Sequence, residues 1–118
     1  LNNYESTIRS DIWSTNTMVP ADYVRTKKMG YTLTKEFPGS IPLFDCYIPS
    51  WDDHMVNPGG CGVEQYLRKL GWVWTTQKAN TLPLYRCFDA INTNHFLSND
   101  QNCDGRGVNE FLLGYIEQ

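Results

Sequence analysis

The chain has 118 residues, of which 41% are hydrophobic, 14% aromatic and 19% charged, a composition typical of one small packed domain and not of a disordered segment. Ten basic and thirteen acidic side chains give a net charge of −3, which argues against nucleic acid or an anionic membrane as the main partner, because phosphate contacts need a basic face. No apolar run approaches the ~20 residues that cross a bilayer, and four cysteines in so short a chain indicate two disulfides and a secreted, extracellular protein.

Residues 1–40 are predicted to form a diverged copy of a unit that recurs twice later in the chain. Laid over the last unit, Tyr4 falls on Tyr85 and Ser6 on Cys87, and the dipeptide Gly30-Tyr31 falls on a later Gly-Tyr. This first unit lacks both cysteines of the later ones. A short helix over 21–27 competes locally with the strand interpretation.

Residues 41–81 are predicted to form the second unit, which reads as four short strands. A run of aromatic and branched residues over 41–48 indicates a strand, followed by a turn at 49–52 and a second strand at 54–56. After a Gly/Asn-rich loop at 57–62, a closing pair of strands is expected around 64–67 and 71–75, with its turn near Lys69 and Leu70. A helix over 63–69 is the competing interpretation, because VEQYLRKL also fits helical spacing.

Residues 82–118 repeat the second unit. Pro83 and Cys87 lie 41 residues after Pro42 and Cys46, and the spacing grows to 43 residues by the time Gly114 repeats Gly71. This small drift is what two short loop insertions produce. A fixed period of about forty residues indicates a repeat architecture in which each copy is one structural unit.

Three units of four short strands predict an all-β single domain with three-fold pseudo-symmetry, its repeats covering 1–40, 41–81 and 82–118. Two closed architectures fit this pattern, and both remove edge strands by closing on themselves. The β-trefoil is favoured, and a compact three-bladed propeller-like ring is the alternative.

The repeats also predict the cysteine pairing. Each of the last two units has one cysteine in its first strand and one in its Gly-rich loop, and the first unit has lost both. Paired loss indicates partners within a unit, so we expect the disulfides Cys46–Cys61 and Cys87–Cys103. A Cys46–Cys87 crosslink between units is the alternative. A zinc site is disfavoured because no CxxC pair or nearby histidine accompanies the cysteines.

The segments PLYRCF, NHFLSND, NCDG and LGYI together resemble a widespread, poorly characterised family of secreted tandem-repeat domains. In that family a PLYR-x-Y strand leads to a (D/N)-H-F strand and ends in a GY or GW strand. The resemblance covers nearly the whole chain, clearly in the last two units and weakly in the first. It implies an extracellular module, in animals and microbes, that is appended to secreted enzymes and adhesins. It therefore implies binding, with glycans as the favoured ligands, but it assigns no functional residues.

Two tryptophans stand apart because neither recurs in the other units. Trp51 lies in a predicted turn next to Asp52, Asp53 and His54, and Trp74 follows in the closing strand. Sugars present C–H faces flanked by hydroxyls, so one flat indole beside short carboxylates is typical of a carbohydrate site. The alternative for Trp51 is an indole that packs over a neighbouring unit.

The two histidines mark a second repeated position. Asp53 precedes His54 and Asn94 precedes His95, while Asp11 occupies the same place in the first unit. If sugar binding is repeated, these acidic or amide side chains are the candidate acceptors, with the histidines beside them. The alternatives are structural histidines with a hydrogen-bonded partner and turn residues bonded to their own backbone.

No catalytic residue, cofactor or metal site is predicted. The segment 100–105 resembles the start of an EF-hand loop, but the twelfth position is Phe111 and no flanking helices are expected. The sequence therefore predicts a secreted, non-catalytic, lectin-like module that binds glycans or glycoproteins through repeated shallow sites. The alternative is a structural or protein-interaction component: a matrix, egg or venom protein, or an inhibitor.

Overall fold

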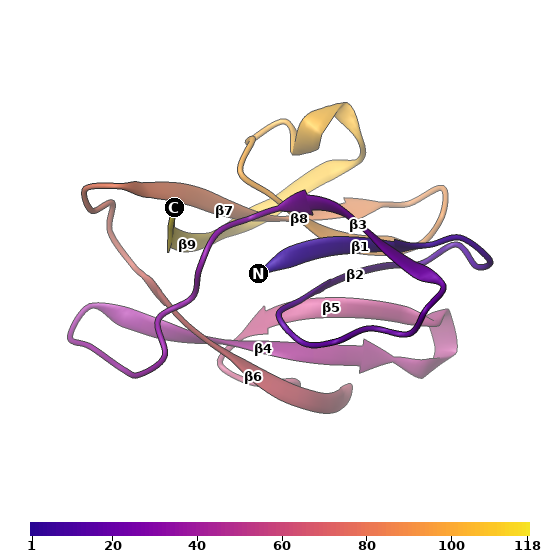
Figure 1. Ribbon diagram of the computed structural model, residues 1–118, viewed down its shortest axis with the longest axis horizontal. Helices are drawn as coiled ribbons and strands as arrows, with labels where there is room; N and C mark the ends of the chain where they lie inside the picture. The colour runs from indigo at the N-terminus through magenta and orange to yellow at the C-terminus, as the bar shows by residue number, and fades with distance from the viewer.

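The computed structural model describes residues 1–118 and is all-β, as predicted (Figure 1). It has nine strands and two short 3₁₀ turns. The strands are β1 (Asn2–Ser6), β2 (Ile12–Thr15), β3 (Tyr23–Lys28), β4 (Ser40–Ile48), β5 (Asp53–Pro58), β6 (Gln65–Trp74), β7 (Thr81–Asp89), β8 (Asn94–Ser98) and β9 (Val108–Glu117). The turns are η1 (Pro49–Trp51) and η2 (Cys103–Gly105). No helix of a length or hydrophobicity that could span a membrane occurs.

Each of the three sequence repeats forms an antiparallel group of three strands with its first strand in the middle. One sheet has the order β2-β1-β3, and the other has the order β5-β4-β6-β9-β7-β8. The larger sheet is thus two copies of the smaller one, joined between β6 and β9 through the single residue pair Trp74–Tyr115. From here on, the groups β1–β3, β4–β6 and β7–β9 are called units 1, 2 and 3.

The prediction of four strands per unit is wrong. The segment expected to hold two strands and a turn near Lys69 is one ten-residue strand, β6, and β9 is its continuous counterpart. The pairing of β4 with β6 shifts register between Leu43 and Phe44, so the chain bends at this point without reversing. The helices considered over 21–27 and 63–69 are absent, since both segments lie in or lead into strands.

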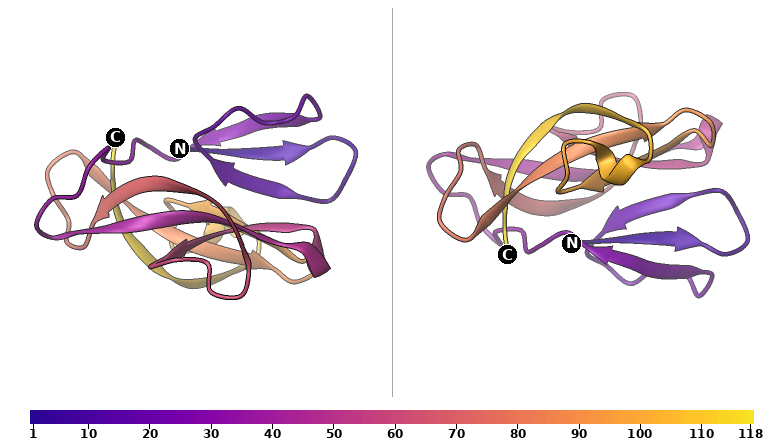
Figure 2. Two further views of the ribbon diagram at one scale, coloured as in Figure 1. Left: turned by 90° about the horizontal axis from the view of Figure 1, so that it is seen from below. Right: turned by 90° about the horizontal axis from the view of Figure 1, so that it is seen from above.

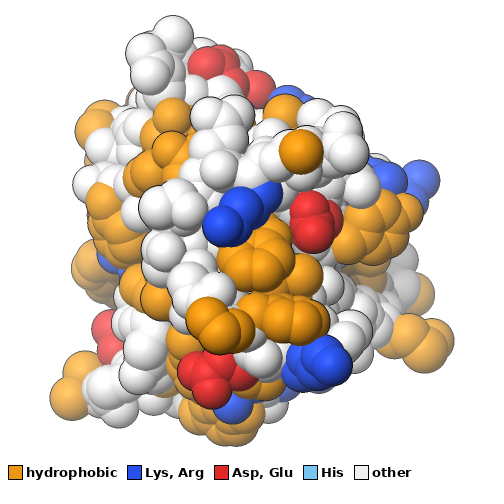
Figure 3. Space-filling model, turned by 90° about the vertical axis from the view of Figure 1, so that its left-hand side faces the viewer, with side chains coloured by type: hydrophobic (Ala, Val, Ile, Leu, Met, Phe, Trp, Pro, Cys, Tyr) orange, Lys and Arg blue, Asp and Glu red, His pale blue; other side chains and the backbone are white.

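The closed β-trefoil barrel is also not found, and three-stranded units do not make four-stranded propeller blades. Beyond the pairing of β6 with β9, the only strand pairing between units is at the isolated bridges Tyr31–Glu117 and Leu33–Trp72. The strands therefore diverge away from this end of the molecule instead of forming a continuous barrel (Figure 2). Viewed along the long axis, the molecule has a three-cornered outline (Figure 3).

Three glycines show that the units are related cyclically. Each has a positive φ, and a Cβ on each would lie 2.4 to 2.6 Å from a backbone carbonyl oxygen of another unit. The contacts run from Gly30 to Glu117, from Gly71 to Leu33 and from Gly114 to Trp74. Only glycine allows so close an approach of two backbones. At this repeated glycine, every unit thus contacts the backbone of another unit in the same way.

The hydrophobic core is built from matching positions of the three units. Its ten buried residues are Leu1, Leu43 and Leu84, then Met29, Leu70 and Leu113, then Val56 and Leu97, then Val73 and Ile116. The second strands β2, β5 and β8 pack against one another in pairs, which places them on the inside of the molecule. This burial is the main stabilising contribution to the fold.

The register of unit 1 differs from the sequence alignment by two residues in its first strand. Tyr4 pairs with Trp13 in the way that Cys46 pairs with Met55, so Tyr4 and not Ser6 occupies the cysteine position. The second strands align as predicted. The disulfides Cys46–Cys61 and Cys87–Cys103 are confirmed, and the crosslink between units is wrong.

Candidate functional site

The repeated acidic or amide position lies at the contacts between units. Asp11, Asp53 and Asn94 each stand at the start of a second strand, or just before it, and all three are buried. Asp11 of unit 1 accepts a hydrogen bond from Nδ1 of His54 of unit 2, at 2.7 Å. Asp53 of unit 2 likewise accepts from Nδ1 and the backbone N–H of His95 of unit 3, at 2.5 and 3.0 Å. Asp11 and Asp53 therefore hold neighbouring units together through buried hydrogen bonds.

The two Asp–His pairs differ in their surroundings. Burial raises the pKa of the Asp53 carboxyl above its ordinary value, and the hydrogen bonds from His95 oppose that shift. Asp11 accepts a further short hydrogen bond from the hydroxyl of Tyr23, and burial together with this bond raises the pKa of that hydroxyl. At the contact between units 3 and 1 no Asp–His pair exists, because Ile12 stands at the histidine position and Oδ1 of Asn94 has no partner.

His54 is enclosed by aromatic side chains. Its ring stacks on Trp13 with 4.1 Å between centroids and 13° between planes. The indole N–H of Trp13 in turn donates to the buried carboxylate of Asp45, at 2.9 Å. The large Trp13 side chain thus fills the space between units 1 and 2, which leaves a shallow hollow of about 260 Å³ there.

Trp51 projects from η1 at the end of β4 and remains 51% exposed. Its indole reaches across to unit 3, where it lies parallel to the ring of His95, at 9° and 6.4 Å between centroids. Phe88 stands next to both, 6.0 Å from Trp51 and 4.6 Å from His95. Trp51 therefore packs over a neighbouring unit and also keeps an exposed aromatic face. Both alternatives considered from the sequence describe it.

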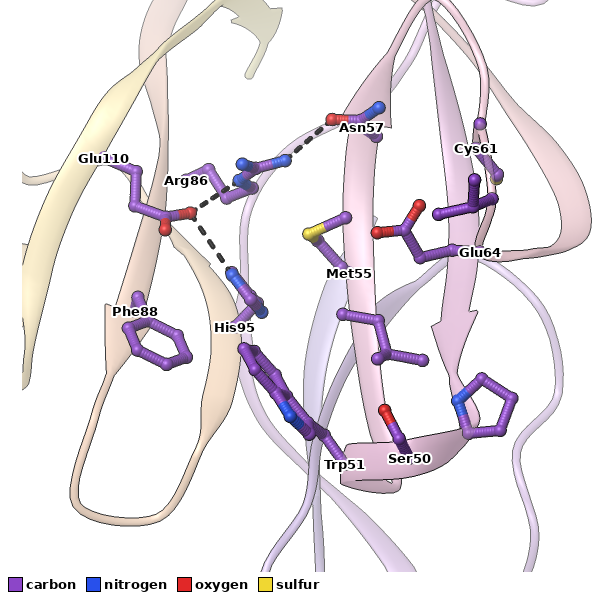
Figure 4. A pocket seen from close by; sticks show the side chains of 14 residues that line it. Ser50, Trp51, Met55, Asn57, Cys61, Glu64, Arg86, Phe88, His95 and Glu110 are labelled. Atoms are coloured by element: carbon purple, nitrogen blue, oxygen red, sulfur yellow. Dashed lines mark hydrogen bonds and ion pairs between the residues drawn. The ribbon is translucent and has the colours of Figure 1, made fainter.

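Beside Trp51 lies the largest cleft of the molecule, about 720 Å³, between units 2 and 3 (Figure 4). It is deep because Met55 stands at the position that Trp13 fills between units 1 and 2. Side chains of Ile48, Pro49 and Val63 supply further apolar lining. A concave, partly apolar site with a few polar groups is the usual form of a small-ligand site.

The polar groups of this cleft come from both units. Arg86 of β7 donates from Nε to Oε1 of Glu110 at 2.7 Å and from Nη1 to Oδ1 of Asn57 at 2.7 Å. The same oxygen of Glu110 lies 3.4 Å from Nε2 of His95. Glu64, just before β6, directs its carboxylate into the cleft from the opposite wall and has no side-chain partner (Figure 4). The cleft therefore offers one free carboxylate, a bridged Arg–Glu pair and an aromatic wall.

The third contact, between units 3 and 1, is lined by pairs of opposite charges. Lys27 pairs with Asp104 at 3.1 Å, and Arg106 pairs with Glu5 at 3.0 Å, over a hollow of about 340 Å³. The three contacts thus hold one hollow each at matching positions, and the one beside Trp51 has more than twice the volume of either of the others.

The remaining predicted residues lie away from the cleft. Trp74 pairs with Ser40 at the start of β4, whereas Trp51 follows the end of that nine-residue strand, so the two indoles stand at opposite ends of the long axis (Figure 1). Trp74 packs against Phe37 with 5.8 Å between ring centroids. Asp52 turns toward unit 1, and its carboxylate accepts hydrogen bonds from Arg9 of that unit and from the hydroxyl of Tyr47 in β4.

Of the predicted site residues, only Trp51 and His95 line the cleft, and sequence reasoning missed Glu64, Arg86 and Glu110. A register shift between Arg86 and Cys87 leaves Glu110 as the extra residue of a β-bulge. Bulges re-aim side chains, and here the bulge turns Glu110 toward the cleft. The one indication in the sequence is that unit 3 has Arg86 at the strand position where unit 2 has Asp45.

Comparisons with known proteins add nothing to these observations: no protein-family model, curated protein or solved structure matches the chain.

Proposed function

We propose that the protein is a non-catalytic carbohydrate-binding module that takes a sugar into the cleft between units 2 and 3. The observation that carries the proposal is Trp51, a half-exposed indole at the mouth of a cleft whose opposite wall holds an unpaired carboxylate. A pyranose has C–H faces that stack on such a ring and hydroxyls that donate to carboxylates. The resemblance to secreted repeat domains supports the same ligand class.

The proposed setting is extracellular. Two disulfides close loops within units 2 and 3, and structural disulfides persist in oxidising compartments. The partners are then glycans, either free or on glycoproteins. Because this cleft has more than twice the volume of either of the other two hollows, we expect one sugar per chain.

The test is a broad glycan array, followed by calorimetry with the sugars that bind. Trp51→Ala is expected to weaken binding about five- to thirty-fold, since the loss of one stacking ring costs about 1–2 kcal/mol. Tyr66→Ala serves as the matched control, because Tyr66 is an exposed aromatic residue outside the cleft. The control should bind like the wild type.

Two results would overturn this proposal. One is the absence of binding to any glycan on the array at millimolar sugar. The other is a sugar that binds with the same affinity to wild type and to Trp51→Ala. Either result would favour the alternative function, a structural or protein-interaction role.

A further inference from the structure

The charges lining the cleft leave a net negative site. Its charged side chains are Arg86, Glu110 and Glu64. The first two are bound to each other at 2.7 Å and neutralise one another, so the carboxylate of Glu64 remains uncompensated. The lining therefore carries about one negative charge at neutral pH, and the buried Asp53 lies directly behind His95.

Arg86 is not available to an anionic ligand. Its guanidinium is held by Glu110 and Asn57, donates also to the carbonyl of Val56, and lies 4.4 Å from the ring of Phe111. With only 13% of its side chain exposed, it cannot turn toward a new partner without breaking these contacts. A sugar acid entering the cleft would therefore meet the carboxylate of Glu64 without a free cation to balance it.

Glu64 is held at the cleft by the covalent framework of unit 2. Its backbone N–H donates to the carbonyl of Cys61 at 2.9 Å, and Cys61 is tied to β4 by the disulfide to Cys46. The turn is thus anchored, and the carboxylate points into the cleft, toward Met55 (Figure 4). The faces of Trp51, which projects from unit 2, and of Phe88 in unit 3 attract cations through their quadrupoles.

These features point to one ligand class. This inference rests on the proposed function: we propose that the cleft selects sugars with a free amino group, that is, hexosamine units whose ammonium is bound by Glu64. The ring of such a sugar offers a C–H face to Trp51, and its ammonium donates charge-assisted hydrogen bonds to the unpaired carboxylate. Neutral sugars can stack in the same way but lack the charge.

The test uses three β-1,4-linked oligosaccharides of equal length that differ only at C2: glucosamine, N-acetylglucosamine and glucose oligomers. Calorimetry at a pH where the amines are protonated is expected to give at least a roughly ten-fold tighter Kd for the glucosamine oligomer. Raising the salt concentration should reduce this preference, because screening acts on the charged ligand alone.

Glu64→Gln is the variant that isolates the charge, since it keeps the shape of the side chain. It is expected to abolish the preference for the amine while retaining the weaker binding of the neutral oligomers. Glu36→Gln, which removes an exposed carboxylate outside the cleft, is the matched control and should keep the preference.

Equal affinity for the three oligomers, or tighter binding of the acetylated one, would overturn the amino-sugar inference and leave the carbohydrate proposal standing. A preference that survives in Glu64→Gln would also overturn it. If none of the oligomers binds and the glycan array is silent too, the proposed function itself fails.

Discussion

At the scale of the residue, Asp53 has a different role from the one that the sequence predicts. Asp53 looks like a sugar acceptor in the sequence, because it lies between a turn and a histidine. In the structure it has no exposed surface and accepts two hydrogen bonds from His95. Burial of such a carboxylate is costly, and its partners keep the cost tolerable.

Asp53→Asn tests this balance through the pH dependence of stability. Because burial raises the pKa of Asp53, the folded protein keeps this proton to a higher pH than the unfolded chain does. Between about pH 3.9, the ordinary pKa of Asp, and the raised pKa, the native state binds more protons. The stability that this group contributes is therefore fully present at acid pH and falls as the pH rises.

The measurement is urea unfolding of wild type and variant across that pH range. The free energy of unfolding of the wild type, minus that of Asp53→Asn, is expected to decrease with rising pH. Glu36→Gln, in the exposed loop before β4, gives the background slope. A difference that grows with pH would mean that His95 stabilises the charged carboxylate by more than burial destabilises it.

At the scale of the element, the continuous strands β6 and β9 depend on a glycine. Gly71 and Trp72 look like the resumption of a strand after a turn, which is why the sequence predicts four strands per unit. No local pattern reveals that the chain bends through Gly71 and continues, since the reason lies in a neighbouring unit: the carbonyl of Leu33. The disulfides, by contrast, follow from the repeats alone, because each closes a loop within one unit.

Gly71→Ala is expected to destabilise the protein by about 3 kcal/mol or more, from a strained φ and an overpacked contact. Its added Cβ would lie 2.5 Å from the backbone oxygen of Leu33, which has no room to move. Gly59→Ala separates the two causes, because Gly59 also has a positive φ (+79°) but no atom within 4 Å of an added Cβ. That control should cost only about 1 kcal/mol. Equal losses in urea unfolding would show that the contact between units contributes nothing.

At the scale of the whole molecule, a three-fold plan has diverged into one large cleft and two smaller hollows. The repeats are visible in the sequence because core leucines, glycines and cysteines recur at a fixed spacing. The differences among the three hollows are less visible, because they depend on which side chain of one unit meets which of the next. Trp51 and His95 could be named from the sequence, whereas Glu64 and Glu110 face the cleft only through an anchored turn and a bulge.

The cyclic plan makes a prediction at the contact between units 3 and 1, where Ile12 and Asn94 stand in place of a His–Asp pair. Ile12 packs against Phe96, just as His54 stacks on Trp13 at the contact between units 1 and 2. Ile12→His alone should destabilise the protein by about 1–3 kcal/mol, since it buries an imidazole without an anionic partner. Asn94→Asp alone should also destabilise, because it buries a carboxylate without a donor.

The double variant is expected to recover part of both losses, with a favourable coupling of about 1–2 kcal/mol in a double-mutant cycle measured by urea unfolding. The coupling arises only if the new imidazole meets the new carboxylate across the same geometry as His54 and Asp11 or His95 and Asp53. Ile12→His combined with Asp100→Asn, an exposed position, is the additive control. Additive losses in the double variant itself would mean that the third contact is not equivalent to the other two, and the cyclic relation would then hold for the backbone alone.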